Sequence, residues 1–294
     1  MSPAGAPGRR AAVLGHPIGH SLSPVLHRAA YAALGLDDWR YDAVDVTEES
    51  LPAHLAGLGP EWAGLSLTMP LKTSVLGLLD HVEPLAEVVG AVNTVLLQHG
   101  PRLAVGANTD VHGVVAALRE GLARTAEPAG PVRTAVVLGA GATAASTLAA
   151  LAQLGCSTPS VHVRSMARAG ATMRAAHRMG VDPRFITLEP LARTLEAMAR
   201  ADVVVSTLPP HAADPIAAAL SERKDGTGEP GVLLDCAYDP RPTALGAAWA
   251  AAGGAVVGGE RMLLHQATEQ VRLMTGLPAP VEAMERALEH ALRT

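Results

Sequence analysis

Residues 133–146, RTAVVLGAGATAAS, decide the fold of this chain. Within them, Ala135–Leu138 is a short apolar run rich in β-branched residues, which is typical of a buried parallel strand. A tight turn of glycine and alanine follows, and Ala142–Leu154 is an apolar segment of helical length. The start of such a helix directs unpaired N–H groups and the positive end of the helix dipole toward the turn. The pattern therefore favours a bound anion, usually the pyrophosphate of a dinucleotide, over a purely structural turn.

The composition limits the kind of protein that this chain can be. A length of 294 residues suggests about two domains, and 49% hydrophobic residues are enough for sizeable cores. A formal net charge of −5 argues against nucleic acid and anionic membrane surfaces as partners. We expect no signal peptide, because the N-terminal residues contain no long apolar segment or clear cleavage site. We expect no membrane span, because glycines and polar residues interrupt the long uncharged stretch 134–163. The two cysteines lie far apart in the sequence and lack the spacing of zinc ligands. With at most one possible disulfide, the chain is best suited to the reducing cytoplasm.

Strand-like and helix-like segments alternate along the chain. In the first half, we expect strands near residues 11–14, 41–46, 63–68, 92–97 and 103–107. Helices are expected at 24–34 with Ser23 as N-cap, at 48–58, from Pro70 onward, and at 110–122. After a weak linker at 123–132, we expect strands at 135–138, 160–163, 184–186, 203–206, 232–235 and 255–257, and closing helices at 259–274 and 281–292. This alternation predicts an α/β fold with mostly parallel sheets and helices on both faces.

The residues after the strand Ser160–Val163 bear on the choice of dinucleotide. In an NAD site, a carboxylate usually stands there and binds the ribose 2′-hydroxyl. Here Arg164 and Arg168 flank Ser165, without any Asp or Glu. Arginine presents a planar, permanently charged set of donors that suits a phosphate. We therefore favour NADP(H) over NAD(H); the alternative is that both arginines are solvated surface charges.

Polar side chains stand at several strand–helix junctions of the first half. Ser21 and Ser23 alternate in a loop before a helix, so both hydroxyls could reach one carboxylate, or Ser23 could simply cap the helix. Lys72 and Asp110 stand at further junctions, and Asn93 lies inside an apolar strand. Each also has a structural explanation, as a surface charge, a helix cap and a buried amide, respectively. Together they indicate a substrate site, because ligands bind at such junctions in open α/β sheets.

Three early histidines, His16, His20 and His27, raise the question of a metal ion. They lack the helical spacing that would align them, and we find no accompanying carboxylate pattern. We therefore expect no metal site.

An ordered set of motifs resembles those of the shikimate dehydrogenase family. They are GHPIGHSLSPVLH, SLTMPLK, AVNT, NTD, VVLGAGATA, VRSMAR and LLHQA. The resemblance covers nearly the whole chain, and the overall sequence is most similar to those of actinobacterial members. It implies two α/β domains: a substrate domain of residues 1–110 and 258–294, and a Rossmann-like NADP-binding domain with a parallel sheet, residues 111–257.

The resemblance also implies an activity. Members of the family reversibly reduce 3-dehydroshikimate to shikimate with NADPH, on the route to chorismate and the aromatic amino acids. The alternatives are a quinate/shikimate or aminoshikimate dehydrogenase of secondary metabolism and a non-catalytic dinucleotide-binding protein. Retention of both serines, Ser21 and Ser23, favours shikimate over quinate. The partner would be the small-molecule substrate, and the chain would be a monomer or a homodimer.

Site residues carried over from the resemblance fall into three groups. Lys72 and Asp110 match the family's catalytic pair. The residues implied in substrate binding are Ser21, Ser23, Ser66, Thr68, Asn93, Tyr238 and Gln266. The residues implied in cofactor binding are Gly139, Ala140, Gly141, Ala142, Thr143, Arg164, Ser165, Arg168, Cys236 and Gly259.

The chain departs from the family pattern at a few positions. Ser66 stands where many members have Asn, which puts one hydrogen bond to the substrate in doubt. Val163 replaces an Asn beside the adenosine, and Cys236 stands where a methionine often packs on the nicotinamide. Ala107 and Ala142 replace a common Asp and a common Gly. None of these changes removes the catalytic pair.

Overall fold

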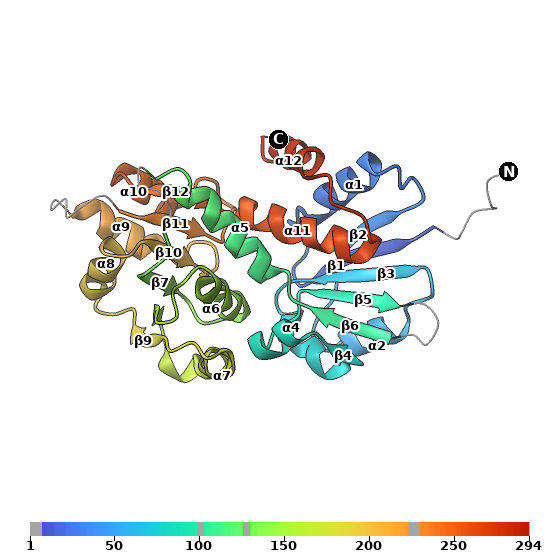
Figure 1. The fold of residues 1–294 in the computed structure, drawn as a ribbon, viewed down its shortest axis with the longest axis horizontal. Coiled ribbons are helices and arrows are strands. Elements are labelled where there is room, and N and C mark those ends of the chain that lie inside the picture. The colour runs from blue at the N-terminus through green and yellow to red at the C-terminus, as the bar shows by residue number, and fades with distance from the viewer. Residues whose placement is uncertain (1–7, 99–102, 126–129, 224–229, 294) are drawn as a thin grey trace. The chain divides into compact units, whose positions relative to one another are not determined.

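The computed structural model describes residues 8–98, 103–125, 130–223 and 230–293. The chain splits into two compact units, each built on a six-stranded sheet (Figure 1). Unit 1 comprises Met1–Thr109 and Gln266–Thr294, and unit 2 comprises Asp110–His265. Residues 126–129 of the expected linker lie outside the described residues. Within the described ranges, no helix combines the length and the hydropathy needed to cross a membrane.

Unit 1 contains a mixed sheet. Its strands are β1 (Arg10–Gly15), β2 (Arg40–Asp45), β3 (Trp62–Leu67), β4 (His81–Val82), β5 (Thr94–Gln98) and β6 (Leu103–Ala107). They lie in the order β2-β1-β3-β5-β6-β4. β5 runs antiparallel to both of its neighbours, β3 and β6, while the other pairs are parallel. The prediction of mostly parallel sheets therefore describes this sheet only in part, because β5 and β6 follow each other without a crossover helix.

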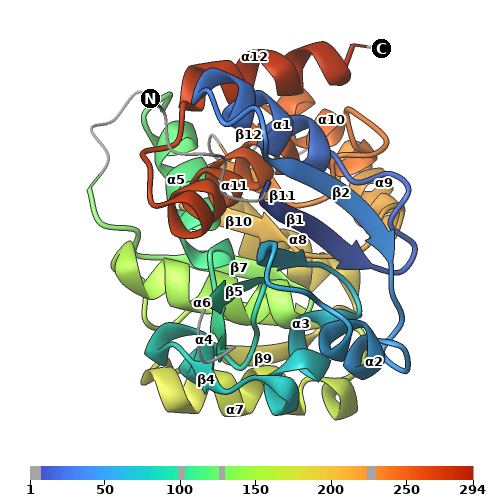
Figure 2. The ribbon, with the colours of Figure 1, turned by 90° about the vertical axis from the view of Figure 1, so that its right-hand side faces the viewer.

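Helices cover both faces of this sheet (Figure 2). They are α1 (Ser23–Ala33), α2 (Leu51–Ala56), α3 (Leu71–Ser74), α4 (Pro84–Val89), α11 (Gly259–Thr275), of which the part from Gln266 belongs to unit 1, and α12 (Val281–Ala291). Alternate residues of β1 enter two separate cores. Ala11 and Val13 pack with tyrosines and Met274 on the face of α1 and α11. Ala12 and Leu14 pack on the opposite face with Leu51 of α2, among others.

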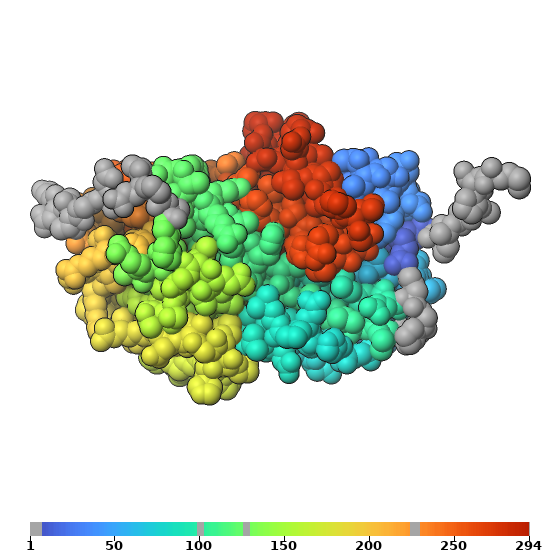
Figure 3. All heavy atoms as spheres, in the orientation of Figure 1, coloured from blue at the N-terminus to red at the C-terminus, as the bar shows by residue number. Residues whose placement is uncertain are grey.

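The C-terminal helices return to the first part of the chain. α12 packs against α1, and in Figure 3 the red surface of the C-terminal helices adjoins the blue surface of the N-terminal segments. Unit 1 is therefore assembled from both ends of the sequence. As a consequence, side chains of α11 lie among residues that are far from them along the chain.

Unit 2 contains a parallel sheet. Its strands are β7 (Ala135–Leu138), β8 (Ser160–Val163), β9 (Arg184–Thr187), β10 (Val203–Ser206), β11 (Val232–Asp235) and β12 (Ala255–Gly258). They lie in the order β12-β11-β10-β7-β8-β9, and all neighbouring pairs are parallel. The strand order reverses between β7 and β10, which is the point where such sheets bind ligands. The turn after β7 is the glycine turn of residues 139–141.

Helices lie on both faces of the second sheet as well. They are α5 (Asp110–Leu122), α6 (Ala142–Gln153), α7 (Gly170–Met179), α8 (Leu191–Ala199), α9 (Asp214–Glu222), α10 (Ala244–Ala251) and the first residues of α11. Side chains of α8, α9 and α10 share one core with β7, β10 and β11. On the other side, α5 contacts β11 and β12, and α6 packs against α5 and α7.

Some predicted boundaries were wrong. The helix expected at 48–58 is only Leu51–Ala56, because Thr47 and Ser50 form a hydrogen-bonded turn before it. Asn93, expected inside a strand, directly precedes β5, which begins at Thr94. The short strand β4 and the helix α4 were not predicted.

Candidate active site

The serine loop of unit 1 connects β1 to α1. Its residues Ser21 and Ser23 are partly exposed and buried, respectively. The hydroxyl of Ser21 accepts the backbone N–H of Ser23 at 3.3 Å, and Ser23 is already the first residue of α1. The prediction that Ser23 caps the helix was therefore wrong. Because the cap position is Leu22, the hydroxyl of Ser23 is not used as a cap.

The segments that follow β1 and β3 lie against each other. The N–H of Thr68 donates to the carbonyl of Leu14 at 2.9 Å, and the N–H of His16 donates to the carbonyl of Met69 at 3.0 Å. A β-carbon on Gly15 would lie only 2.3 Å from Cγ2 of Thr68, so this close approach requires glycine. The contact brings the serine loop beside the turn that carries Thr68 and leads to Lys72. Lys72 itself is half-buried on α3.

Asn93 and Gln266 meet in the interior of unit 1, although 173 residues separate them. Nδ2 of Asn93 donates to Oε1 of Gln266 at 3.2 Å and to Oγ1 of Thr109 at 2.9 Å. Oδ1 of Asn93 accepts the backbone N–H of Thr109 at 2.7 Å. All three residues are buried, so these hydrogen bonds hold the two amides in defined orientations.

Ser66 also belongs to this buried polar group. Its hydroxyl lies 2.8 Å from Oε1 of Gln270 and 2.6 Å from the hydroxyl of Tyr41. Sequence reasoning missed Tyr41, Gln270 and Thr109 as residues of the site. The polar residue Gln270, one helical turn after Gln266, was a signal, because both amides then lie on one face of α11.

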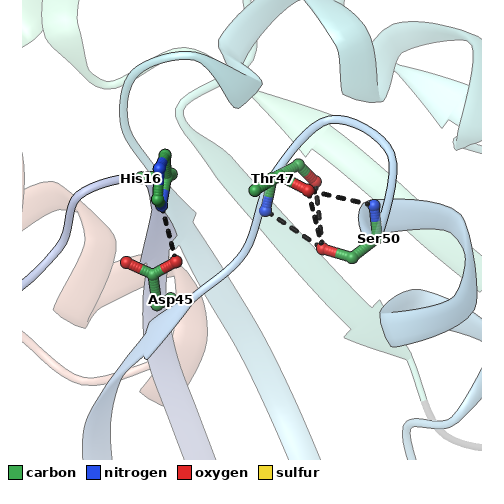
Figure 4. Close-up of polar contacts among 4 residues, drawn as sticks. All are labelled: His16, Asp45, Thr47 and Ser50. Atoms are coloured by element: carbon green, nitrogen blue, oxygen red, sulfur yellow. Dashed lines mark hydrogen bonds and ion pairs between the residues drawn. The ribbon is translucent and has the colours of Figure 1, made fainter.

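His16 has a carboxylate partner that the sequence did not reveal (Figure 4). Its Nδ1 lies 2.7 Å from Oδ1 of Asp45, at the end of the neighbouring strand β2. Thr47 and Ser50, also in Figure 4, bond to each other in the turn before α2. In the described part of the chain, no group of three or more His, Cys, Asp or Glu side chains could hold a metal ion.

The glycine turn of unit 2 has the geometry of an anion site. Gly139 has φ of +106°, and a β-carbon there would lie 2.6 Å from Oγ1 of Thr207. Gly141 is the N-cap of α6, is exposed, and receives no side-chain cap from the described residues. A β-carbon on Gly141 would meet no described atom within 4 Å. The first N–H groups of α6, from Ala142 and Thr143 onward, have no side-chain cap among the described residues, which fits a pyrophosphate.

The two arginines after β8 are exposed. Arg164 directly follows the strand, and Arg168 ends the 3₁₀ turn Met166–Arg168. Ser165 lies between them and is partly exposed. β8 pairs with β7, so this segment follows the strand next to the glycine turn. This segment leads into α7, and α7 contacts the glycine turn: the hydroxyl of Thr172 donates a hydrogen bond to the carbonyl of Ala140 at 2.7 Å.

The remaining predicted residues of unit 2 lie after β11 and at the start of α11. A β-carbon on Gly259 would lie 2.2 Å from the carbonyl oxygen of Cys236, so only glycine allows this approach. The thiol of Cys236 lies 3.7 Å from Sδ of Met262. Burial, with the nearby charge of Asp239, raises the pKa of Tyr238 above its ordinary value. Cys156 and Cys236 form no disulfide in the described part of the chain.

The predicted site residues divide between the units. Unit 1 holds Ser21, Ser23, Ser66, Thr68, Lys72, Asn93 and Gln266. Unit 2 holds Asp110, Tyr238 and the residues predicted to bind the cofactor. Asp110 is buried as the first residue of α5, directly after Thr109. The pairing of Lys72 with Asp110 stays a prediction.

The fold and the glycine turn place the chain in a class of proteins. A six-stranded parallel sheet with this strand order and a glycine turn after its first strand is typical of the dinucleotide-binding α/β oxidoreductases. Residues 13–95 match the family model for the shikimate dehydrogenase substrate binding domain, and residues 259–289 match that for the shikimate 5′-dehydrogenase C-terminal domain. The chain belongs to the shikimate dehydrogenase family.

Full-length relatives support this membership. The shikimate dehydrogenase (NADP(+)) of Rubrobacter xylanophilus is 38% identical over 280 residues, which are 94% of this chain and 94% of the relative. The crystal structure of Mycobacterium tuberculosis shikimate dehydrogenase is 41% identical with a TM-score of 0.81, covering 96% of this chain and 99% of that one. The Thermus thermophilus enzyme in complex with NADP(H) and shikimate is 34% identical with a TM-score of 0.77, covering 96% and 99%.

Proposed function

We propose that this chain catalyses the NADP-dependent, reversible reduction of 3-dehydroshikimate to shikimate. The observation that carries the proposal is the contact of Asn93 with Gln266, 173 residues apart, in the interior of unit 1. Both residues stand in motifs that match the family, and relatives named shikimate dehydrogenase (NADP(+)) are similar over the full length. Convergence of distant motif residues is expected of a substrate pocket.

The proposed chemistry assigns the proton to Lys72. The bound nicotinamide supplies the hydride to the ketone, or accepts it in the reverse direction. The ammonium group of Lys72 stabilises the negative charge that develops on the oxygen and then transfers a proton to it. Asp110 orients Lys72 and binds the neighbouring hydroxyl of the substrate. Proton transfer by a positioned group of this kind accelerates a reaction roughly 10²–10⁴-fold.

The proposed substrate pocket uses neutral donors for the carboxylate. Ser21 and Ser23, at the start of α1, bind it with help from the helix N-terminus. Thr68, Asn93, Gln266 and Tyr238 bind the carboxylate and the ring hydroxyls. Neutral, hydrogen-bonded groups of fixed orientation select a hydroxylated ring, because an analogue without its hydroxyl would leave buried polar atoms unpaired.

The proposed cofactor is NADP(H). The open N-terminus of α6 takes the pyrophosphate, and Gly141 lets the backbone approach it closely. Arg164 and Arg168, with Ser165 between them, bind the adenosine 2′-phosphate. Gly259 and Cys236 lie beside the nicotinamide. We further propose that the enzyme acts in the cytoplasm.

A side-by-side assay tests this function. Shikimate and quinate are each supplied with NADP⁺ and with NAD⁺, and the reduced nicotinamide is followed by its absorbance. We expect turnover of shikimate with NADP⁺ to exceed every other combination. Faster turnover of quinate with NAD⁺ would instead support a quinate/shikimate dehydrogenase, and binding of NADP⁺ without any turnover would support a non-catalytic protein. Aminoshikimate as a third substrate separates the remaining alternative.

A further inference from the structure

The amide of Gln270 has only one possible orientation. Its Nε2 lies 3.1 Å from the backbone carbonyl oxygen of Asn93 and 3.0 Å from Oγ1 of Thr94. A carbonyl oxygen can only accept a hydrogen bond, so the nitrogen must face it. Oε1 of Gln270 therefore faces the hydroxyl of Ser66 at 2.8 Å and Nε2 of His27 at 3.2 Å.

This orientation fixes the direction of two further protons. Oε1 of Gln270 can only accept, so Ser66 must donate its single hydroxyl proton to it. The hydroxyl of Tyr41, 2.6 Å from Oγ of Ser66, must then be the donor in that contact. A chain of hydrogen bonds with one direction results: Tyr41 donates to Ser66, and Ser66 donates to Gln270.

His27 supports the same orientation. It is fully buried, and its ring stacks on Tyr41 with 3.9 Å between the ring centroids. Its Nε2 donates to Gln270, while its Nδ1 has no hydrogen-bond partner among the described residues. Burial lowers the pKa of His27 to about 3, so the ring is neutral and carries one proton. That proton is on Nε2, as Oε1 of Gln270 requires.

The other end of Gln270 fixes Asn93. Thr94 accepts from Nε2 of Gln270, so its own proton is free to bond Oδ1 of Asn93 at 3.0 Å. Oδ1 also accepts the backbone N–H of Thr109 at 2.7 Å, and Nδ2 of Asn93 is turned toward Gln266. The orientation set at Gln270 thus reaches the amide that we propose binds a ring hydroxyl.

We propose that Tyr41 and Gln270 are positioning residues of the substrate pocket, holding Ser66 and Asn93 in one fixed hydrogen-bond pattern. This inference rests on the proposed function. It also changes the part played by Ser66: its only proton is committed to Gln270, so Ser66 is a link in the chain and does not donate a hydrogen bond to the substrate. Buried hydrogen bonds of fixed direction resist reorientation, so the pocket is organised before the substrate arrives.

The substitution Tyr41→Phe tests the proposal because it removes the hydroxyl that donates to Ser66. We expect the KM for shikimate to rise roughly tenfold, which corresponds to the loss of about one net hydrogen bond. The kcat should change less than about threefold, because Tyr41 touches no reacting atom, and the KM for NADP⁺ should stay unchanged. This split distinguishes a positioning role from a general loss of stability, which would lower the amount of active enzyme and leave both KM values unaltered.

Tyr31→Phe is the matched control. Tyr31 lies in the same aromatic cluster, 6.4 Å from Tyr41 between ring centroids, but its buried hydroxyl has no partner among the described residues. We expect the kinetics of this variant to equal those of the wild type. If Tyr31→Phe raised the KM for shikimate as much as Tyr41→Phe, the effect would belong to the packing of the cluster, and the proposal would be wrong.

A double-mutant cycle tests the link through Ser66. Ser66→Ala should raise the KM for shikimate to a similar extent, and the double variant Tyr41→Phe/Ser66→Ala should be no worse than either single variant. Additive effects would overturn the proposed chain. The outcomes also separate the two proposals: a wild type without shikimate turnover contradicts the function, whereas an active wild type and a Tyr41→Phe variant with unchanged KM contradict only the positioning role.

Discussion

The backbone carbonyl of Lys72 accepts a 2.8 Å hydrogen bond from the N–H of Val92. This bond joins α3 to the residue before Asn93. Lys72, the proposed proton donor, and Asn93, proposed to bind a ring hydroxyl of the substrate, therefore stand on adjoining backbone segments. Thr68 begins the same turn, since its carbonyl accepts the N–H of Leu71 at 2.8 Å. Three residues of the proposed substrate pocket are thereby fixed relative to one another by main-chain contacts, which side-chain substitution leaves in place.

Replacing Lys72 should therefore affect the chemistry more than the binding. We expect Lys72→Ala to lower kcat at least about 10²-fold with a smaller change in the KM for shikimate, because the group that stabilises the developing charge is lost. Steady-state kinetics measure both constants, and thermal unfolding checks that the variant is folded. A kcat equal to that of the wild type would remove Lys72 from the reaction.

The arginines after β8 should decide between the two dinucleotides. We expect Arg164→Ala and Arg168→Ala each to raise the KM for NADP⁺ by about tenfold, the equivalent of one charge-assisted hydrogen bond. The KM for NAD⁺, which lacks the 2′-phosphate, should barely change, and the KM for shikimate serves as an internal control. An equal loss for both dinucleotides would show that the arginines do not bind the 2′-phosphate.

The glycines of the turn after β7 should separate binding from stability. In Gly141→Ala the added methyl group meets no described atom within 4 Å, so we expect nearly unchanged thermal stability. The same methyl group stands where the pyrophosphate would approach, so the Kd for NADP⁺, measured by calorimetry, should rise at least about tenfold.

Gly139→Ala is the matched comparison for that variant. Its φ of +106° and a β-carbon 2.6 Å from Oγ1 of Thr207 make any side chain unfavourable there. We expect a clear decrease in the melting temperature without added cofactor. If Gly141→Ala destabilised the apoprotein as much as Gly139→Ala, the space beside Gly141 would not be open, and an unchanged Kd for NADP⁺ would show that the pyrophosphate does not bind there.

Two buried histidines should make the stability depend on pH. Burial lowers the pKa of His27 to about 3 and that of His162 to about 4, whereas both titrate near 6.5 when unfolded. Between these values the unfolded chain binds more protons, so the free energy of unfolding falls as the pH decreases from about 6.5 to about 4. Each histidine contributes up to about 1.4 kcal/mol per pH unit in this range.

Urea unfolding at a series of pH values measures this slope. His162→Gln should show a shallower slope than the wild type, because one of the two groups no longer titrates. An identical slope for His162→Gln and the wild type would mean that His162 keeps its proton in the folded protein.

Local patterns in the sequence predicted most of the elements. The strands Ala135–Leu138, Ser160–Val163, Val203–Ser206 and Val232–Asp235 and the helix Asp110–Leu122 have the expected bounds. These segments are apolar runs between clear turn residues, so short-range preferences are sufficient to define them. The glycine turn between a strand and a helix was also predictable, because it depends on residues that are adjacent along the chain. The role of the arginines after β8 stays a prediction.

The sequence by itself determined which residue types stand at the ends of the strands and hence the class of the protein. Only the tertiary structure decided that β5 runs antiparallel, that Asp45 reaches His16, and that Tyr41 and Gln270 hold Ser66. The physical reason is the range of the interactions. A strand or a turn follows from neighbours along the chain, whereas the direction of a buried hydrogen bond depends on which distant donors and acceptors the packing brings together.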